Sequence, residues 1–283
     1  MRYNLIYLYR RRVLIKAKKK FGQNFLKDEA ILEKIIQSKP KDAITVAEIG
    51  PGLGDLTQKL LTTCEKVVAF EIDLELCGVL RKKFSDELQA KQLTLECADV
   101  LDAWGENSLL ESEYHLVANL PYYVATNIIL RALADTKCRS ILVMVQKEVA
   151  VKFASKVEDK EFSGLAILAS SIAKAEVLFD VGSECFDPAP KVTSAVLKLT
   201  KSTEFVKDDD GEGLFDSQKE FKEFQTFLKV AFTAPRKTLY KNLQQQASKE
   251  SILACFEDLS LQQNIRPHQL PISKYHLLFK NLK

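Results

Sequence analysis

Residues 44–55 read ITVAEIGPGLGD, an apolar run followed at once by Gly50, Gly52 and Gly54. A short apolar run bounded by glycines is typical of a buried strand, and glycines between a strand and a helix let the backbone approach a ligand closely. A dinucleotide site has the spacing G-x-G-x-x-G, whereas here the third glycine comes one place early. The loop therefore favours a nucleoside cofactor without a pyrophosphate over a dinucleotide.

Similar apolar runs alternate with stretches of helical spacing along the chain. The expected strands are residues 44–49, 67–72, 93–97, 114–118, 141–145, 175–181 and 194–199, and helices are expected at 29–37, 56–61 and 74–88, the first capped by Asp28. Alternation of this kind predicts the α/β class, with a doubly wound, mostly parallel sheet.

The last quarter of the chain differs in composition. Residues 206–217 are acidic and polar, and they form a candidate linker between a catalytic domain (18–205) and a helical domain (218–283). Helical spacing recurs there at 221–232, 236–246, 251–259 and 272–282. Because residues 218–283 hold eleven basic and five acidic residues, we expect this helical domain to be basic.

The first 20 residues hold eight of the 41 basic residues and no acid, which leaves 33 basic against 38 acidic residues in the rest of the chain. A basic arm on a near-neutral body suggests phosphate contacts. We expect residues 1–17 to be a disordered extension; an over-long start and an organelle transit peptide are the alternatives. Arg10 to Arg12 interrupt any apolar region that a signal peptide needs.

The cysteine spacing and the length of the apolar runs both predict a cytoplasmic protein. Six cysteines show no C-x-x-C pair and no regular spacing, so we expect reduced thiols in a cytoplasmic protein, and neither a metal site nor a disulfide framework. No apolar run approaches the ~18 residues of a membrane span. No exposed apolar heptad stands out, and we expect a monomer.

Acidic residues follow two of the expected strands. Glu71 lies 21 residues after Gly50, where a carboxylate can accept hydrogen bonds from both ribose hydroxyls. Asp99 lies just beyond the third strand, where it can accept from the amino group of an adenine. Either acid alone would be an ordinary surface or cap residue.

The fourth strand ends in Asn119-Leu120-Pro121-Tyr122. Asn119 supplies a carbonyl acceptor and an amide donor, Pro121 stiffens the backbone, and Tyr122 offers a flat face for a base. By itself this tetrapeptide could be a turn that merely ends a strand. Together with the glycine loop and the two acids, it predicts an S-adenosylmethionine-dependent methyltransferase with a Rossmann-like fold, acting on an amine of a planar ring.

These motifs resemble the ribosomal RNA adenine N6-dimethyltransferase family, and specifically its small-subunit branch. The matching segments are residues 21–26, 48–54, 71–73, 99, 119–122, 146–150, 186–192 and 236–239. The resemblance implies a seven-stranded sheet, and cofactor contacts from Asn24, Leu26, Gly50, Glu71, Asp99 and Asn119, with Gly52 beside them in the loop. It has no counterpart for residues 1 to about 15.

The resemblance also implies a reaction. The substrate would be two adjacent adenosines in the 3′-terminal hairpin of the small-subunit (16S) rRNA, within an immature small ribosomal subunit. Asn119 and the backbone carbonyl of Leu120 would accept the N6 hydrogens, while Tyr122 and Phe186 would stack on the base. Candidate phosphate contacts are Lys18, Lys19, Lys20, Lys191, Arg236, Lys237 and Lys241.

Three other functions remain open from the sequence. The same chemistry on a large-subunit adenosine would confer macrolide-type resistance, although Leu120 is more typical of the small-subunit branch. A non-catalytic ribosome-assembly or RNA-binding factor would not need the intact loop and acids. A methyltransferase acting on a small-molecule or DNA amine would leave the basic helical tail unexplained.

Overall fold

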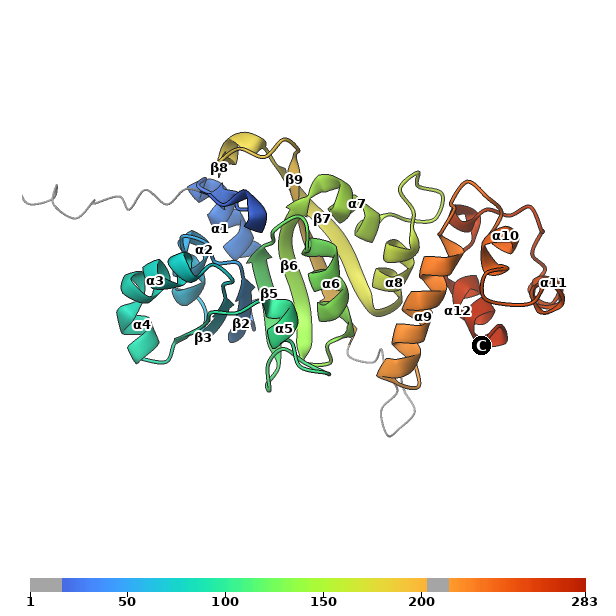
Figure 1. The fold of residues 1–283 in the computed structure, drawn as a ribbon, viewed down its shortest axis with the longest axis horizontal. Helices are drawn as coiled ribbons and strands as arrows, with labels where there is room; N and C mark the ends of the chain where they lie inside the picture. The colour runs from blue at the N-terminus through green and yellow to red at the C-terminus, as the bar shows by residue number, and fades with distance from the viewer. Residues whose placement is uncertain (1–16, 203–213) are drawn as a thin grey trace, which may run out of the picture.

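The computed structural model describes residues 17–202 and 214–283, and a seven-stranded sheet lies at its centre (Figure 1). The strand order is β4-β3-β2-β5-β6-β9-β7. The bounds are β2 (Thr45–Ile49), β3 (Lys66–Phe70), β4 (Leu93–Glu96), β5 (Tyr114–Asn119), β6 (Cys138–Gln146), β7 (Ala173–Val181) and β9 (Ser194–Lys201). The pairs among the first five strands of this order are parallel, and β9 runs antiparallel to β6 and β7. The expected α/β fold is confirmed.

Helices cover both faces of the sheet because neighbouring strand residues point to opposite sides. On one face, Val46 and Val117 pack against α1 (Glu29–Ser38), α2 (Asp55–Leu61), α3 (Leu74–Lys83) and α4 (Ser85–Gln89). On the other, Ala47 and Leu116 pack against α5 (Val100–Ala103), α6 (Ala125–Ala134), α7 (Lys147–Ala154) and α8 (Gly164–Ile172). Within the described residues, every helix is too short or too polar to span a bilayer.

Aspartates start several of these helices. Asp28 accepts a hydrogen bond from Ile31 N at 3.0 Å, as the sequence predicted for the N-cap of α1. Asp73 and Asp99 likewise accept from backbone N–H groups at the starts of α3 and α5, at 3.1 and 2.9 Å. Each acid satisfies a donor that would otherwise lack a partner and so fixes where its helix begins.

Two short strands that the sequence did not suggest bring the N-terminal segment to the sheet. β1 (Phe25–Leu26) pairs antiparallel with β8 (Phe186–Asp187), with Leu26 opposite Phe186. Two 3-10 turns flank the pair, η1 (Lys19–Phe21) and η2 (Ser183–Cys185). Segments about 160 residues apart in the sequence therefore lie side by side (Figure 1).

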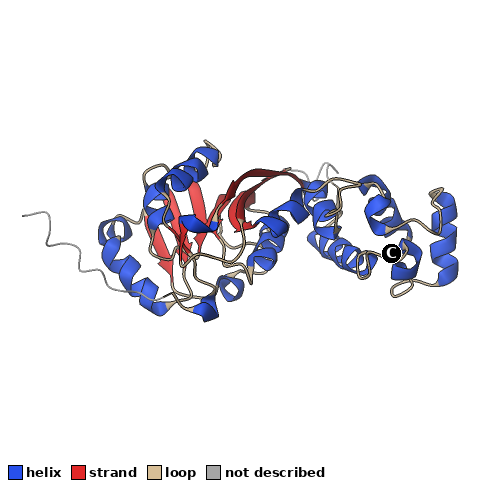
Figure 2. Cartoon of the chain, turned by 90° about the horizontal axis from the view of Figure 1, so that it is seen from above, coloured by secondary structure: helices blue, strands red, loops and turns tan. Residues whose placement is uncertain are grey.

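The C-terminal region is entirely helical, and it packs on one end of the sheet domain (Figures 1 and 2). It contains α9 (Gln218–Ala231), α10 (Leu239–Leu243), α11 (Lys249–Asp258), the 3-10 turn η3 (Pro267–Gln269) and α12 (Ile272–Asn281). α9 packs against α6 and α8, and His276 on α12 contacts Ser171 on α8 at 2.9 Å. The two regions share one continuous apolar core.

Three sequence expectations differ from the structure. The helix expected at 74–88 is interrupted at Phe84, whose buried ring packs beside Gly54. The helix expected at 236–246 is only α10, because turns lie on both sides of it. Cys77 on α3 and Cys97 just after β4 are joined as a disulfide, with their Cα atoms 6.2 Å apart. These two thiols were expected to be reduced.

Residues 1–16 and 203–213, which hold most of the expected extension and linker, lie outside the described residues.

Gly54 and Gly78 offer a matched test of the packing at the start of α2. Gly54 has a φ of +79°, and a Cβ there would lie 2.5 Å from Phe84 Cε2, whereas a Cβ on Gly78 would meet nothing within 4 Å. We expect Gly54→Ala to lower the free energy of unfolding by about 1–3 kcal/mol. Gly78→Ala in the middle of α3 should raise it by about 0.5–1 kcal/mol. Urea unfolding of both variants measures this, and equal effects would contradict the packing described.

Candidate active site

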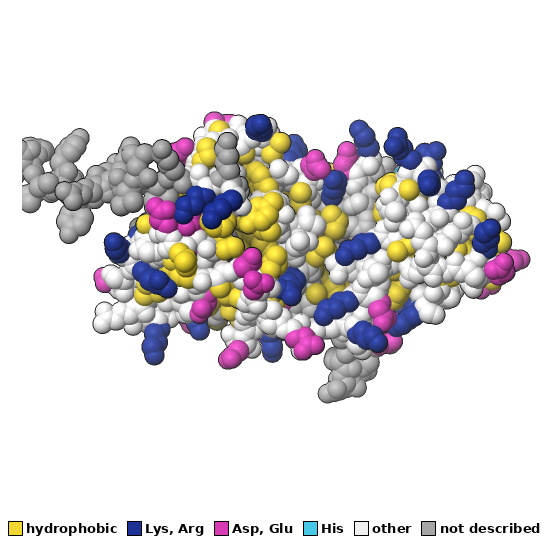
Figure 3. Space-filling model, in the orientation of Figure 1, with side chains coloured by type: hydrophobic (Ala, Val, Ile, Leu, Met, Phe, Trp, Pro, Cys, Tyr) yellow, Lys and Arg dark blue, Asp and Glu magenta, His cyan; other side chains and the backbone are white. Residues whose placement is uncertain are grey.

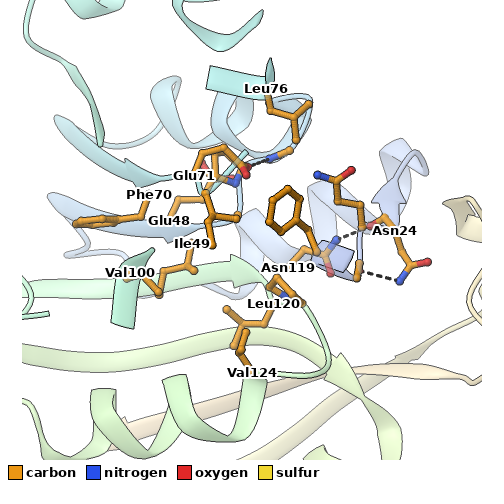
Figure 4. A pocket seen from close by; sticks show the side chains of 18 of the residues that line it. Asn24, Glu48, Ile49, Phe70, Glu71, Leu76, Val100, Asn119, Leu120 and Val124 are labelled. Atoms are coloured by element: carbon orange, nitrogen blue, oxygen red, sulfur yellow. Dashed lines mark hydrogen bonds between the residues drawn. The ribbon is translucent and has the colours of Figure 1, made fainter. Parts of the chain in front are cut away.

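A cavity lies at the carboxyl ends of β2, β3, β4 and β5 (Figure 4). Most of its lining comes from five segments: residues 21–26, 48–53, 70–72, 98–101 and 119–124. Among its lining are all the expected cofactor residues and the catalytic tetrapeptide: Asn24, Leu26, Gly50, Gly52, Glu71, Asp99, Asn119, Leu120, Pro121 and Tyr122. The structure thus brings together residues as far apart in the sequence as Asn24 and Tyr122.

The glycine loop allows its neighbours to come close. Gly50 and Gly52 have φ values of +68° and +60°, which side chains with a Cβ rarely adopt. A Cβ on Gly52 would lie 3.0 Å from Phe25 Cδ1, so the N-terminal segment rests directly on the loop. A Cβ on Gly50 would lie 3.7 Å from Pro121 Cδ. The glycines therefore let three chain segments meet around one cavity.

Glu71 stands at the end of β3 with only 4% of its surface exposed. Its Oε1 accepts from Asp73 N at 2.9 Å and its Oε2 from Gly52 N at 3.2 Å. Burial raises the pKa of this carboxyl above its ordinary value, and the two backbone donors oppose the rise. A carboxylate oxygen can accept more than one hydrogen bond, so both oxygens can still take a hydroxyl group each.

Asp99 is half-buried at the start of α5, where one oxygen accepts from Leu101 N at 2.9 Å. A carboxylate oxygen at this position can accept from an amino group. Apolar side chains line the cavity next to it, including Phe70, Ile72 and Val100. An acceptor beside an apolar slot suits a planar base that carries an exocyclic amine.

Asn119 is oriented by a bond to the N-terminal segment. Its Nδ2 donates to the backbone carbonyl of Asn24 at 3.1 Å, across 95 residues of sequence (Figure 4). The amide end is thereby engaged, and the side-chain carbonyl is left as the end that can accept a hydrogen bond. Asn24 in turn donates from its own Nδ2 to Gly22 O at 3.3 Å.

The rest of the tetrapeptide is also anchored. Leu120 is buried, and its N–H donates to Met144 O at 3.1 Å, which extends the pairing beyond β5. The hydroxyls of Tyr122 and Ser194 lie 2.6 Å apart, and this contact fixes the direction of the Tyr122 ring. Phe186, expected to stack on the base, is only 5% exposed and packs with Leu26 in the core, outside the cavity lining. Phe186 is paired with Leu26 of β1, and its role as a stacking residue stays a prediction.

The basic residues expected to bind phosphate are not gathered at the cavity. Lys18 Nζ contacts Asp73 Oδ1 at 2.7 Å and Glu75 Oε2 at 2.9 Å, and these hydrogen bonds raise the pKa of the lysine. Lys18 therefore ties the N-terminal segment to α3. The side chain of Lys19 lies outside what the structure describes. The remaining candidates are exposed: Lys20, Lys191, Arg236, Lys237 and Lys241.

Sequence reasoning missed three residues that shape the site. Gln23 bonds Asp73 Oδ2 at 3.0 Å, and Phe25 covers the glycine loop. Tyr123 lines the cavity next to Tyr122. Only the last had a signal, as a second aromatic residue directly after the catalytic tetrapeptide. The others follow from the β1–β8 pairing, which no local pattern reveals.

Glu48 is a second buried carboxyl in the cavity lining, with 1% of its surface exposed. Burial raises its pKa to about 8. Its Oε2 atom has no hydrogen-bond partner in the part of the chain that the structure describes. An acid in this environment is held in its neutral form near neutral pH.

The raised pKa of Glu48 predicts how stability changes with pH. Between pH 4.5, the ordinary pKa, and about 8, the folded chain keeps a proton that the unfolded chain releases, so stability falls as pH rises. We expect Glu48→Gln to remove this dependence. The difference in unfolding free energy between the variant and the wild type should then grow by about 1.4 kcal/mol per pH unit within this window. Urea unfolding without cofactor at pH 5, 6.5 and 8 measures it, and parallel pH profiles would refute it.

Solved structures share this fold at low sequence identity. A dimethyladenosine transferase from Plasmodium falciparum matches with a TM-score of 0.71 and 24% identity, over 90% of this chain and 95% of that one. The 23S rRNA methyltransferase ErmE matches with a TM-score of 0.67 and 22% identity, over 92% and 99%. At such identities these likenesses show the fold alone.

Curated relatives are much more similar in sequence. A protein of Campylobacter curvus named ribosomal RNA small subunit methyltransferase A is 51% identical over 95% of this chain and 93% of its own length. A protein of the same name from Sulfurimonas denitrificans is 50% identical over 94% of each. The family model described as ribosomal RNA adenine dimethylase matches residues 14–283. The chain therefore belongs to the ribosomal RNA adenine dimethylase family.

Proposed function

We propose that this chain transfers methyl groups from S-adenosylmethionine to N6 of two adjacent adenosines near the 3′ end of small-subunit rRNA, in an immature small subunit. The hydrogen bond of Asn119 supports the chemical half of this proposal, since its Nδ2 donates to Asn24 O and its carbonyl remains as the acceptor. The names of relatives about 50% identical over nearly their whole length support the choice of substrate.

The cavity fits the proposed cofactor in its residue chemistry. Glu71 has two oxygens for ribose hydroxyls, and Asp99 lies beside an apolar slot for the adenine. The glycine loop and Asn24 line the remaining wall, where the methionine part would bind. The cofactor would supply an electrophilic methyl group on a sulfonium.

Asn119 and Leu120 would prepare the amine of the target adenine. The N6 lone pair of adenine is delocalised into the ring, which makes the amine a poor nucleophile. The Asn119 side-chain carbonyl and the Leu120 backbone carbonyl would accept the two N6 hydrogens and localise that lone pair for an in-line displacement. In the second transfer N6 carries one hydrogen, so one acceptor suffices.

Tyr122 would hold the target base outside its helix. Extruding a base costs a few kcal/mol, and stacking on an aromatic ring offsets about 1–3 kcal/mol of this. Because the Tyr122 hydroxyl is 2.6 Å from that of Ser194, the ring is already oriented before a base arrives. A pre-oriented ring loses little conformational freedom on binding.

The helical region supplies the proposed rRNA contacts. Arg236, Lys237 and Lys241 line a hollow on the surface together with Arg266. Lysine and arginine side chains gather along the upper right of the molecule in Figure 3, over this region. Cationic side chains of this kind would bind the phosphate backbone, and their affinity for it would fall as the salt concentration rises. Lys20 and Lys191, also exposed, are the candidates nearer the catalytic segment.

Transfer of labelled methyl from S-adenosylmethionine to two substrates tests this function. The first is small ribosomal subunits that lack their adenine methyl groups, and the second is protein-free large-subunit RNA. We expect label in the small subunit, at two adjacent dimethyladenosines. If only large-subunit RNA is labelled, the substrate is large-subunit RNA and the proposed substrate is wrong. If neither is labelled although cofactor binds, the result favours a ribosome-assembly factor.

Asn119→Ala should abolish most turnover while leaving much of the cofactor binding. Loss of the acceptor should reduce the rate of methyl transfer by about 10²–10³-fold. The dissociation constant of the cofactor should rise by less than about tenfold, since Glu71 and Asp99 remain. Asn127→Ala, on an exposed position of α6 outside the cavity lining, is the matched control. If Asn119→Ala turns over at the wild-type rate, Asn119 does not take part in the methyl transfer.

A further inference from the structure

Tyr123 is an exposed aromatic residue at the edge of the cavity. It is 60% exposed, yet it belongs to the cavity lining. Its neighbours in the chain, Tyr122 and Val124, are both more buried. One face of the ring is thus in contact with the protein wall and the rest is open.

The N-terminal segment supports this ring. A Cβ on Gly22 would lie 3.2 Å from Tyr123 Cδ1 and 3.5 Å from its Cε1, so the ring rests on the glycine backbone. Gly22 has a φ of +60°, which favours glycine at this turn. The segment that carries Asn24 therefore also holds Tyr123 beside the cavity.

The two consecutive tyrosines serve different sides of the loop. The Tyr122 hydroxyl contacts Ser194 on β9, toward one side of β5. Tyr123 lies instead within electrostatic reach of Asp99 and Glu71, at the ends of β4 and β3 on the other side. Partial burial raises the pKa of Tyr123, and the negative charges of these two acids raise it further. Tyr123 therefore lines the cavity near the two acids of the proposed nucleoside site, whereas the Tyr122 hydroxyl is held on the other side of β5.

We propose that Tyr123 is a lid residue of the cofactor site, whose ring closes over the adenosine part of S-adenosylmethionine and opposes its release. This inference rests on the function proposed above. The open face of the ring gives the flat apolar surface that a nucleoside needs, opposite the acids that take its hydroxyls and amine. Dimethylation of two adenosines needs four transfers, so spent cofactor must leave four times. A lid made of one exposed side chain can open for this without unfolding the site.

Binding of cofactor without RNA tests the lid directly. The dissociation constants of S-adenosylmethionine and S-adenosylhomocysteine are measured by calorimetry for the wild type, Tyr123→Ala and Tyr123→Phe. Tyr123→Ala should weaken both by roughly tenfold, since one aromatic contact to a base is lost. Tyr123→Phe keeps the ring and should stay within about twofold. Leu253→Ala, an exposed apolar residue on α11, is the control and should bind as the wild type does.

Steady-state kinetics on small subunits separate this role from others. Tyr123→Ala should raise the KM for S-adenosylmethionine by a factor similar to the loss of affinity, with the KM for the subunit unchanged. Thermal unfolding without cofactor should be unaltered, because the side chain is exposed. If Tyr123→Ala leaves the cofactor dissociation constant unchanged and raises the KM for RNA, the ring contacts the target base, and the lid proposal is wrong. If the wild type binds no cofactor, both the proposed function and the lid proposal are contradicted.

Discussion

The hydrogen bond from Asn119 Nδ2 to the carbonyl of Asn24 connects the main parts of the site. It joins the end of β5 to a segment that precedes the first long helix, and it fixes which end of the amide faces the cavity. Without it, the side chain could turn its donor toward the target amine and lose the acceptor that the proposed reaction needs. The pairing of β1 with β8 and the contact of Phe25 with Gly52 hold the same segment in place.

Acidic groups dominate the electrostatics of the cavity. Glu48 and Glu71 are both buried in its wall, and burial raises the pKa of each. Asp73, by contrast, is paired with Lys18, and its pKa is lowered because hydrogen bonds to Lys18 and Gln23 outweigh burial. A positively charged ligand, such as the sulfonium of the proposed cofactor, would lower the pKa of nearby carboxyls. Binding of such a ligand would favour their charged forms.

Local patterns predicted the parts of the site that belong to strand ends. Parallel strands end at one edge of a sheet, so the glycine loop, Glu71, Asp99 and the tetrapeptide after β5 had to meet there. Family resemblance was needed for Asn24, because its place depends on a strand pairing about 160 residues away. Packing also decided what patterns could not: Phe84 breaks a helix to fill space beside Gly54. Phe186 became core for the same kind of reason.

A crystal structure of the chain with S-adenosylhomocysteine tests the central claim most directly, namely that the strand-end groups form one preorganised cofactor site. The account predicts both ribose hydroxyls within hydrogen-bond distance of Glu71 and the adenine amine next to Asp99. The sulfur should face Asn119, whose bond to Asn24 should persist. A nucleoside bound elsewhere, or an Asn119 amide turned with its nitrogen toward the sulfur, would contradict it.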